Sequence, residues 1–540
     1  MLQTRTAGPV QQDRFAAIPA ADIPRSAFDR SYSVKTTFDV DYLVPILADE
    51  ALPGDTIVLR PTLFARMATP LYPLMDNLYL DVHYWAVPIR LIWDNFQAFM
   101  GEQIDPGDST DYLVPQIESA TGVFAFQSLA DYFGFPPLAT SGAVDRMSAL
   151  WHRSYNLIYN EWYRDENLID SAPLDRDDGP DAVADYPLRK RGKRKDYFTS
   201  ALPWAQKGDP VTVPLGDTAP VVPTSTSAGF SLKISSGGTP TAVNVDDTSG
   251  SSGQVALSIN NPTGAAGITP VMWGSTGLMA DLADATAATI NVLRQAIAIQ
   301  RLLERDARGG TRYTEILRAH FGVISPDARL QRPEYLGGGS FPINIATVPN
   351  TSALGAPIGE LGGYGTALGK PAPIHKSFTE HCIILGLVSV RADLNYQQGI
   401  PRQFLRRTKY DFYWPALSHL GEQAIQSREI FHDGTGNEAA GTGDYSIFGY
   451  AERWSEYRFK PSQITGKLRS SYSLPLDVWH VAEEFATRPT LNQTFIECNT
   501  PINRVLAETT EYDFLLDGHV QMTHVRPMPT YSVPGLMDHF

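Results

Sequence analysis

Residue types that could carry enzyme chemistry are present, but they do not stand at the spacings that catalysis needs. The sequence has no G-x-S-x-G elbow for a serine nucleophile and no H-E-x-x-H pair for zinc. GTALGK at 365–370 is similar to a phosphate-binding loop, but it is one residue short and Pro371 replaces the Ser or Thr. His381 and Cys382 would point to opposite faces of a strand, so they cannot share a metal ion. We therefore predict no enzyme activity and no cofactor.

The acidic stretch DRDDGPD (175–181) is a weak candidate for a calcium site. Its hard oxygen ligands would come from Asp175, Asp177, Asp178 and Asp181. Gly179, however, stands where an EF-hand loop needs a ligand, and Tyr186 replaces its closing Glu. A solvated acidic loop is the favoured interpretation, and calcium binding is the alternative.

The basic stretch RKRGKRK (189–195) is the main candidate for DNA binding. Its six cations could contact phosphates without reading sequence: Arg189, Lys190, Arg191, Lys193, Arg194 and Lys195. Tyr197, Phe198 and Trp204 could stack on single-stranded bases. In the alternative, the cluster neutralises the preceding acidic stretch or pairs with a neighbouring subunit. A weaker set of candidates is Arg25, Arg30 and Lys35.

Composition narrows the class of protein further. The chain has 540 residues with 43% hydrophobic residues, 43 Gly and 40 Pro, which is too rich in loops for a helical bundle. Its net charge of −15 argues against coating nucleic acid by bulk attraction. Two cysteines exclude a disulfide framework. With no apolar run of ~18 residues and no signal peptide, we expect folding in a reduced, intracellular compartment.

Strand patterns lie toward the two ends of the chain. Residues 78–86 alternate with a period of two, and CIILGLVSV (382–390) is a continuous apolar run typical of a strand buried on both faces. We predict two more strands at 503–515 and 518–527, separated by a turn near Asp517-Gly518. Because these ends must pair across several hundred residues, the pattern favours a β-sandwich with long inserted connections.

Helices and loops are expected between those strands. Helical spacing predicts helices near 91–101, over 144–164 and over 284–308, with a shorter helix at 311–321. The Gly-, Ser- and Thr-rich segment 208–277 reads as a variable surface insertion of short β-hairpins. Residues 1–33 read as an extended N-terminal arm, which leaves 34–540 as one domain that carries the 208–277 and 284–321 insertions.

Seven stretches of the sequence closely resemble one family, the major capsid proteins of gokushovirus-like Microviridae, which are small single-stranded DNA bacteriophages. They cover nearly the whole chain outside the first ~30 residues and 208–277. The stretches are FDVDYLVPILADEALPGDT (38–56), ARMATPLYPLMDNLYLD (65–81), WDNFQAFMGEQ (93–103), KRKDYFTSALPWAQKG (193–208), LLERDARGGTRYTEILRAHFGVISPDARLQRPEYLGGG (302–339), GYAERWSEYRFKPSQITGKLRS (449–470) and PGLMDHF (534–540).

This resemblance implies a mainly β fold, an eight-stranded viral jelly roll with large inserted loops that contain helices. It implies a T=1 icosahedral shell around circular single-stranded DNA, assembled in the host bacterial cytoplasm. The implied partners are further copies of the chain, a small basic DNA-binding protein, a DNA pilot protein, an internal scaffolding protein and a host surface receptor. In such shells a hypervariable insertion forms protrusions at the threefold axes, and 208–277 has the matching composition and position.

Aromatic and basic residues of the structured loops are the candidates for contacts between subunits. Spaced cations on the 284–321 helices would repel one another unless acids of this or another chain offset them. The candidates are Arg301, Arg305, Arg308, Arg312, Trp414 and Trp454. Two other classes of protein use this fold and are the alternatives to a capsid protein. One is a carbohydrate-binding β-sandwich, and the other is a glycoside hydrolase, which would need two facing carboxylates.

Overall fold

The chain forms two compact units in the computed structural model. Residues 1–207 together with 304–540 form the larger unit, and 208–303 form the smaller one. The structure describes residues 24–119, 124–137, 146–209, 211, 290–327, 329, 331–351, 359–510 and 512–531, and five short strands between 221 and 280. No helix among these residues is long and apolar enough to cross a membrane.

A four-stranded antiparallel sheet forms one layer of the larger unit. Its strands, in spatial order, are β14 (Glu334–Pro342), β5 (Leu78–Pro88), β18 (Cys382–Ala392) and β3 (Val44–Ala51). In β18 every residue except Ala392 is buried. The prediction of a strand covered on both faces is thus confirmed.

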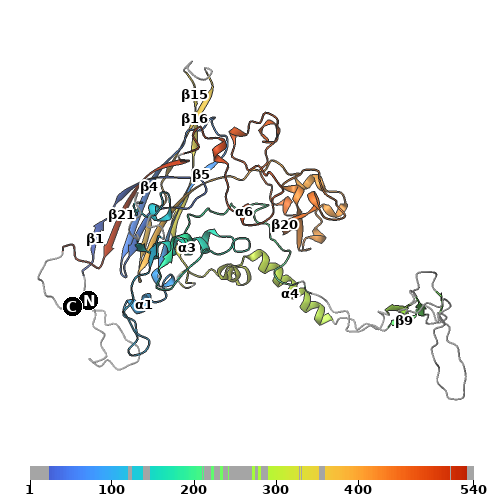
Figure 1. The fold of residues 1–540 in the computed structure, drawn as a ribbon, viewed down its shortest axis with the longest axis horizontal. Coiled ribbons are helices and arrows are strands. Elements are labelled where there is room, and N and C mark those ends of the chain that lie inside the picture. The colour runs from blue at the N-terminus through green and yellow to red at the C-terminus, as the bar shows by residue number, and fades with distance from the viewer. Residues whose placement is uncertain are drawn as a thin grey trace, which may run out of the picture. The chain divides into compact units, whose positions relative to one another are not determined.

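A seven-stranded sheet forms the second layer (Figure 1). At its centre β21 (Phe514–Arg526) pairs antiparallel with β4 (Thr56–Met67), from Phe514 opposite Met67 to Val525 opposite Thr56. The other strands are β1 (Ser26–Asp29), β2 (Tyr32–Phe38), β15 (Asn344–Pro349), β16 (Leu361–Gly369) and β17 (Ile374–Ser377). The expected pairing of the two ends of the chain is therefore present, and the mainly β sandwich is confirmed.

Hydrophobic side chains fill both faces of the four-stranded sheet. On β5, Leu80, Val82 and Tyr84 face the core shared with the seven-stranded sheet. Trp85 and Val87 face a second core on the opposite side, which includes Trp93 and Tyr155. Successive side chains of a strand point to opposite faces, so one strand serves two cores.

The prediction of two strands in the C-terminal region was wrong. Residues 502–504 form a 3₁₀ turn, and β21 runs without a break through Asp517-Gly518. Gly518 lies inside the core, where a Cβ would stand 2.8 Å from Leu63 Cδ2 and 2.9 Å from Val34 Cγ1. The glycine therefore permits close packing between strands rather than a turn.

The helices lie where they were predicted, but their lengths differ from the predicted ones. The first region contains a 3₁₀ turn (Ile89–Leu91) and α1 (Phe96–Phe99). The second is shorter than predicted, because β7 (Arg146–Ser148) precedes α3 (Leu150–Ile158) and a π turn (Tyr159–Tyr163). Then come α4 (Ile290–Gly309), α5 (Tyr313–Ile316) and a π turn (Leu317–Phe321).

The remaining elements are short. In the larger unit they are β6 (Gln116–Glu118), α2 (Leu129–Tyr132), β8 (Asp181–Ala182), β19 (Glu422–Gln426), β20 (Ile447–Glu452) and α6 (Gln493–Ile496), with several 3₁₀ turns. In the smaller unit they are β9 (Val221–Pro223), β10 (Leu232–Ile234), β11 (Thr241–Ala242), β12 (Val271–Trp273) and β13 (Leu278–Ala280). All three pairings among these strands are antiparallel. β10 and β11 are consecutive, as in the predicted hairpins, whereas β12 pairs with β10, and β13 pairs with β9, across longer separations in the sequence.

The part of the N-terminal arm that the structure describes is held by the sheet. β1 and β2 pair with β21, and Arg30 forms a 2.6 Å ion pair with Asp49. Residues 1–23 lie outside the described residues. The boundaries proposed for the arm and the insertions stay predictions.

Gly518→Val should lower the free energy of unfolding by about 1–3 kcal/mol, because the added methyl groups overlap Leu63 and Val34 in a filled core. Denaturant unfolding of the full chain measures this change. Gln521→Val on the exposed face of the same strand is the control, with an expected change within about 0.5 kcal/mol. Equal effects of the two substitutions would contradict the packing argument.

Burial lowers the pKa of His152 from its usual 6.5 to about 4. Below pH 6.5 the unfolded chain takes up a proton that the folded chain refuses, so stability should fall as pH drops from 6.5 to about 4. The loss approaches about 3 kcal/mol at the low end. His152→Phe keeps an aromatic ring against Phe133 and Tyr186. It should flatten the fall in stability measured by unfolding at several pH values. An unchanged slope would show that His152 does not titrate in this range.

Candidate nucleic-acid and subunit-contact sites

The first part of the basic stretch runs through the body of the subunit. Lys190 forms an isolated β-bridge with Tyr42, and Gly192 forms one with Glu497. All five residues of 189–193 are half-buried or buried. The backbone of this stretch thus joins the N-terminal strands to the C-terminal loops.

Arg191 takes part in a buried ion-pair network. Its Nη1 lies 2.6 Å from Asp81 Oδ2, and Arg391 Nε lies 2.8 Å from the same oxygen. Burial alone would raise the pKa of Asp81, but Arg191 and then Arg391 favour the charged form and the net pKa is lowered. Next to this network, burial and the positive charge of Arg191 lower the pKa of His83 to about 4. The network keeps one carboxylate charged between two guanidinium groups.

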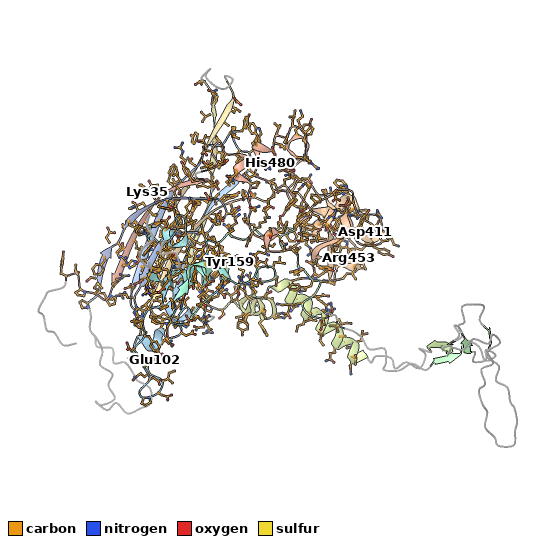
Figure 2. The ribbon with its side chains drawn as sticks, in the orientation of Figure 1. Lys35, Glu102, Tyr159, Asp411, Arg453 and His480 are labelled. Carbon is orange, nitrogen blue, oxygen red and sulfur yellow. The ribbon has the colours of Figure 1, made fainter. Side chains whose placement is uncertain are left out.

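Three other cations of the stretch are also satisfied within the chain. Lys193 Nζ pairs with Glu483 at 2.7 Å and lies over the Phe495 ring. Arg189 Nε donates to Asn156 Oδ1 at 3.1 Å, and its guanidinium lies over the Tyr159 ring, which is labelled in Figure 2. Lys190 Nζ donates to Asn499 Oδ1 at 3.3 Å. These side chains hold the subunit together.

The last two residues of the stretch, Arg194 and Lys195, are exposed. Lys195 pairs with Asp165, whereas Arg194 has no acidic partner among the described residues. DNA contact by the 189–195 stretch stays a prediction, and geometry leaves these two cations as the ones that phosphates can reach.

The expectation that Tyr197 and Phe198 stack on bases was wrong. Their exposed fractions are 5% and 2%, and both rings lie in a third hydrophobic core. Tyr197 Oη also donates to Glu429 Oε2 at 2.9 Å. Trp204 is half-buried. Rings inside a core cannot stack on a nucleic acid without local unfolding.

The four aspartates of the acidic stretch face different partners. Asp181 accepts from Arg153 Nε at 2.8 Å and from Tyr186 Oη at 2.6 Å. Asp178 accepts from Trp93 Nε1 at 2.7 Å. Asp177 accepts from the Gly179 amide, and Asp175 is exposed. Nowhere in the described ranges do three or more His, Cys, Asp or Glu side chains gather in a way that could hold a metal ion.

The helical arginines divide into two groups. Arg308 pairs with Glu422 and lies 3.8 Å from Glu452, and Arg312 pairs with Glu166. These acids belong to the same chain. Arg301 and Arg305 are exposed. Contact with a neighbouring subunit stays a prediction for all four, and only the latter two are left without an acid in the part of the chain that the structure describes.

The two candidate tryptophans differ in accessibility. Trp414 is 49% exposed, with its Nε1 donating to Lys409 O at 2.7 Å. Trp454 is only 3% exposed and packs edge-to-face on Tyr413. Contact with a neighbouring subunit stays a prediction for both tryptophans, and Trp414 is the one whose ring is accessible on the surface of the chain.

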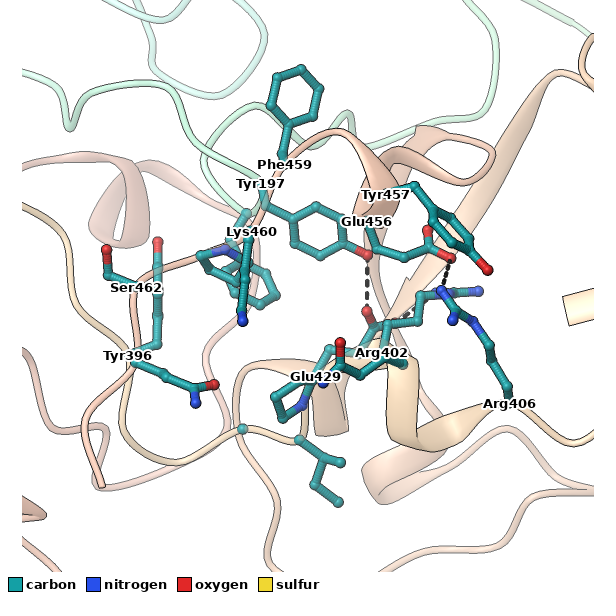
Figure 3. Close-up of a pocket in the computed structure, with 17 residues that line it drawn as sticks. Tyr197, Tyr396, Arg402, Arg406, Glu429, Glu456, Tyr457, Phe459, Lys460 and Ser462 are labelled. Atoms are coloured by element: carbon teal, nitrogen blue, oxygen red, sulfur yellow. Dashed lines mark hydrogen bonds and ion pairs between the residues drawn. The ribbon is translucent and has the colours of Figure 1, made fainter. Parts of the chain in front are cut away.

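A cavity of about 140 Å³ adjoins Trp454's loop (Figure 3). Arg402 Nη1 lies 2.6 Å from Glu429 Oε1, and Arg406 lies 3.4 Å from Glu456. Burial raises the pKa of Glu429, while Arg402 acts in the opposite direction. The charges of these four side chains thus offset one another.

Two groups of residues escaped the sequence interpretation. The Arg153–Asp181 pair joins α3 to β8, and the Arg402–Glu429 pair joins two 3₁₀ turns. The paired residues are 28 and 27 positions apart on different elements, so no periodicity in the sequence marks the partner. A readable signal did exist in RQFLRRTKYDFYW (402–414), where cations and aromatic residues alternate. Of these residues, only Trp414 is among the subunit-contact candidates predicted from the sequence.

Comparison with known proteins identifies the class. The sequence matches the family described as capsid protein (F protein) over residues 16–536. Capsid protein VP1 of Bdellovibrio phage phiMH2K is 47% identical over 541 residues, covering 98% of each chain. That of Chlamydia phage 1 is 40% identical and covers 99% of this chain and all of its own. That of Spiroplasma virus 4 is 34% identical over 97% of each.

The chain belongs to this family of phage capsid proteins. It is therefore a major capsid protein of the Microviridae, a structural component of the virion and not an enzyme. The resemblance stated from the seven sequence stretches is confirmed.

Arg191→Met should lower the free energy of unfolding by about 1.5–3 kcal/mol, because it removes a charged partner of buried Asp81. Arg194→Met, three residues away on the surface, should change it by less than about 0.5 kcal/mol. Thermal unfolding of both variants makes the comparison. An Arg191→Met protein as stable as the unsubstituted protein would contradict the structural role of Arg191 and leave DNA binding as its alternative role.

Proposed function

We propose that this protein assembles into a T=1 icosahedral shell, with one copy per asymmetric unit, around circular single-stranded DNA. The observation that carries the proposal is the family match over residues 16–536, together with three relatives named capsid proteins. The double-layered β body supports it, because such sandwiches serve as the walls of viral capsids.

The charge of the subunit supports the proposal that a separate protein neutralises the packaged DNA. The chain carries −15, and the cations of 189–193 are engaged within the fold. Attraction of DNA phosphates therefore falls to a separate small basic DNA-binding protein. The proposed partners also include a DNA pilot protein and, during assembly in the bacterial cytoplasm, an internal scaffolding protein.

The proposed attachment surface is the insertion at 208–277. It is rich in Gly, Ser and Thr, and its described strands are two or three residues long. A long insertion adds little loop-closure entropy, so sequence change there is tolerated by the rest of the fold. We assign to it an outward protrusion near a threefold axis that contacts a receptor on the host.

Replacing residues 212–268 with a short Gly-Ser linker should leave particle assembly intact and reduce adsorption to host cells, because the segment contains few large apolar residues. Electron cryomicroscopy of purified particles measures the shell and its symmetry, and a binding assay measures adsorption. A variant with the same 212–268 residues in scrambled order is the control for length. Failed assembly would make the segment a structural contact, and unchanged adsorption would remove the attachment role.

A further inference from the structure

Loops of the larger unit expose an unusual concentration of aromatic side chains. We call residues 402–414 with 453–460 the aromatic-basic patch. Its rings are between 48% and 70% exposed: Phe404, Tyr410, Phe412, Tyr413, Trp414, Tyr457 and Phe459. A soluble monomer rarely exposes so many large apolar side chains together, and such a patch marks an interaction surface.

The patch is also positively charged. It contains seven basic and two acidic residues in a chain whose net charge is −15. Arg407 pairs with Glu438, and Arg458 pairs with Glu452 at the end of β20. Lys409, Arg453 and Lys460 have no carboxylate partner within the described part of the chain; Lys409 and Arg453 lie over the Tyr410 and Trp454 rings. A partner must therefore offer both negative charge and apolar surface.

The cavity described above opens beside this patch. Lys460 and Phe459 belong to its lining, together with Tyr396 and Arg406 (Figure 3). A cavity volume of only about 10–15 Å³ is enough to hold one water molecule. At about 140 Å³ it has room for an aliphatic side chain.

A second surface of the same unit has the complementary chemistry. We call residues 100–113 (MGEQIDPGDSTDYL) the acidic loop, which contains four acids and no basic residue. Residues 100–111 are all exposed, and the three large apolar side chains Met100, Ile104 and Leu113 are 51%, 89% and 81% exposed. The described residues contain no cation that pairs with any of its four carboxylates: Glu102, Asp105, Asp108 and Asp111.

The tip of the acidic loop has a defined local structure. The Asp105 amide donates to Asp108 Oδ2 at 2.9 Å, and the Asp108 amide donates to Asp105 O at 3.1 Å. Gln103 Nε2 also donates to Asp108 O at 2.7 Å. These bonds form a compact turn with Ile104 at its edge, so little conformational entropy remains to be lost on binding.

We propose that the acidic loop of one copy binds the aromatic-basic patch of the next copy, with Ile104 entering the cavity and the carboxylates meeting Lys409, Arg453 and Lys460. The proposal rests on the proposed function, since it requires self-assembly. Within one copy the two surfaces lie at opposite sides of the larger unit, where Figure 2 labels Glu102 on one side and Asp411 and Arg453 on the other. They can meet only between copies. A contact between two different surfaces is head-to-tail, and it forms a closed ring when the rotation from one copy to the next closes.

Cysteine cross-linking in particles tests the contact directly. The chain's own cysteines, Cys382 and Cys498, are buried and should not react. A chain with Ile104→Cys and Phe459→Cys should give a ladder of covalent oligomers on oxidation, whose longest member reports the ring size. Ile104→Cys with Leu368→Cys, which places the second thiol on the exposed seven-stranded sheet, is the matched control and should give none.

Intact particles without a 104–459 ladder would overturn this contact and leave the capsid function standing. Dimers from Ile104→Cys alone would show like surfaces meeting and would also overturn it. If the unmodified chain forms no particles with its partner proteins, the proposed function fails first.

Charge reversal supplies an independent test. Reversing the acidic loop (Glu102→Lys, Asp105→Lys, Asp108→Lys) or the patch (Lys409→Glu, Arg453→Glu, Lys460→Glu) should lower particle yield about tenfold or more, because like charges then meet. Both triple changes in one chain should restore the yield. Asp170→Lys, an exposed acid outside the loop, is the control, and thermal unfolding checks that each variant folds.

Normal assembly of the loop variant would overturn the proposal. So would a patch variant that assembles normally but loses packaged DNA, because the patch would then bind nucleic acid. Failure of the double reversal to restore the yield, in variants that fold, would count against the pairing of these two surfaces.

Discussion

The pairing of β21 with β4 is the constraint on which the rest of the subunit depends. Twelve residue pairs join a strand near the C-terminal end to one near the N-terminal end. β1 and β2 add to the other edge of β21, so the N-terminal region is held by residues 476 to 500 positions away. Everything between must leave the sheet and return to it. Because of this single pairing, the long segments between the strands are insertions in one β-sandwich and not separate domains joined end to end.

The four-stranded sheet shows how those branches are stabilised. Because its strands carry apolar residues on both faces, the sheet supports a sandwich core on one side and a loop-and-helix core on the other. Trp85 and Val87 would be exposed without α3 and the segments near it. Buried ion pairs such as Arg153–Asp181, which joins α3 to β8, then hold the elements of this loop-and-helix core to one another. Such pairs specify a conformation, since an unpaired charge at 0% exposure is costly.

The features that could be predicted from the sequence are those that leave a local pattern in it. Periodicity located β5 and β18 and predicted the pairing of the two ends, because burial on one or two faces leaves a readable trace along a strand. It failed at Gly518, since a glycine that permits close strand packing looks the same in sequence as a glycine in a turn. It failed at Tyr197 and Phe198, because an aromatic residue next to basic residues carries no sign of whether it is buried. The function was predicted from similarity over long stretches of sequence and not from a chemical motif. The ion pairs of Asp81 with Arg191 and Arg391 had no local signal, because tertiary contacts bring these residues together.

The same strand pairing determines the order in which a growing chain can fold. All four strands of the four-stranded sheet have been synthesised once residue 392 is made. The edge of β4 that pairs with β21 stays without this partner until residues 514–526 emerge. Pairing at such a sequence separation is intrinsically slow. An unpaired strand edge invites aggregation during that interval. A nascent chain therefore lacks the complete seven-stranded sheet until β21 has emerged and paired with β4.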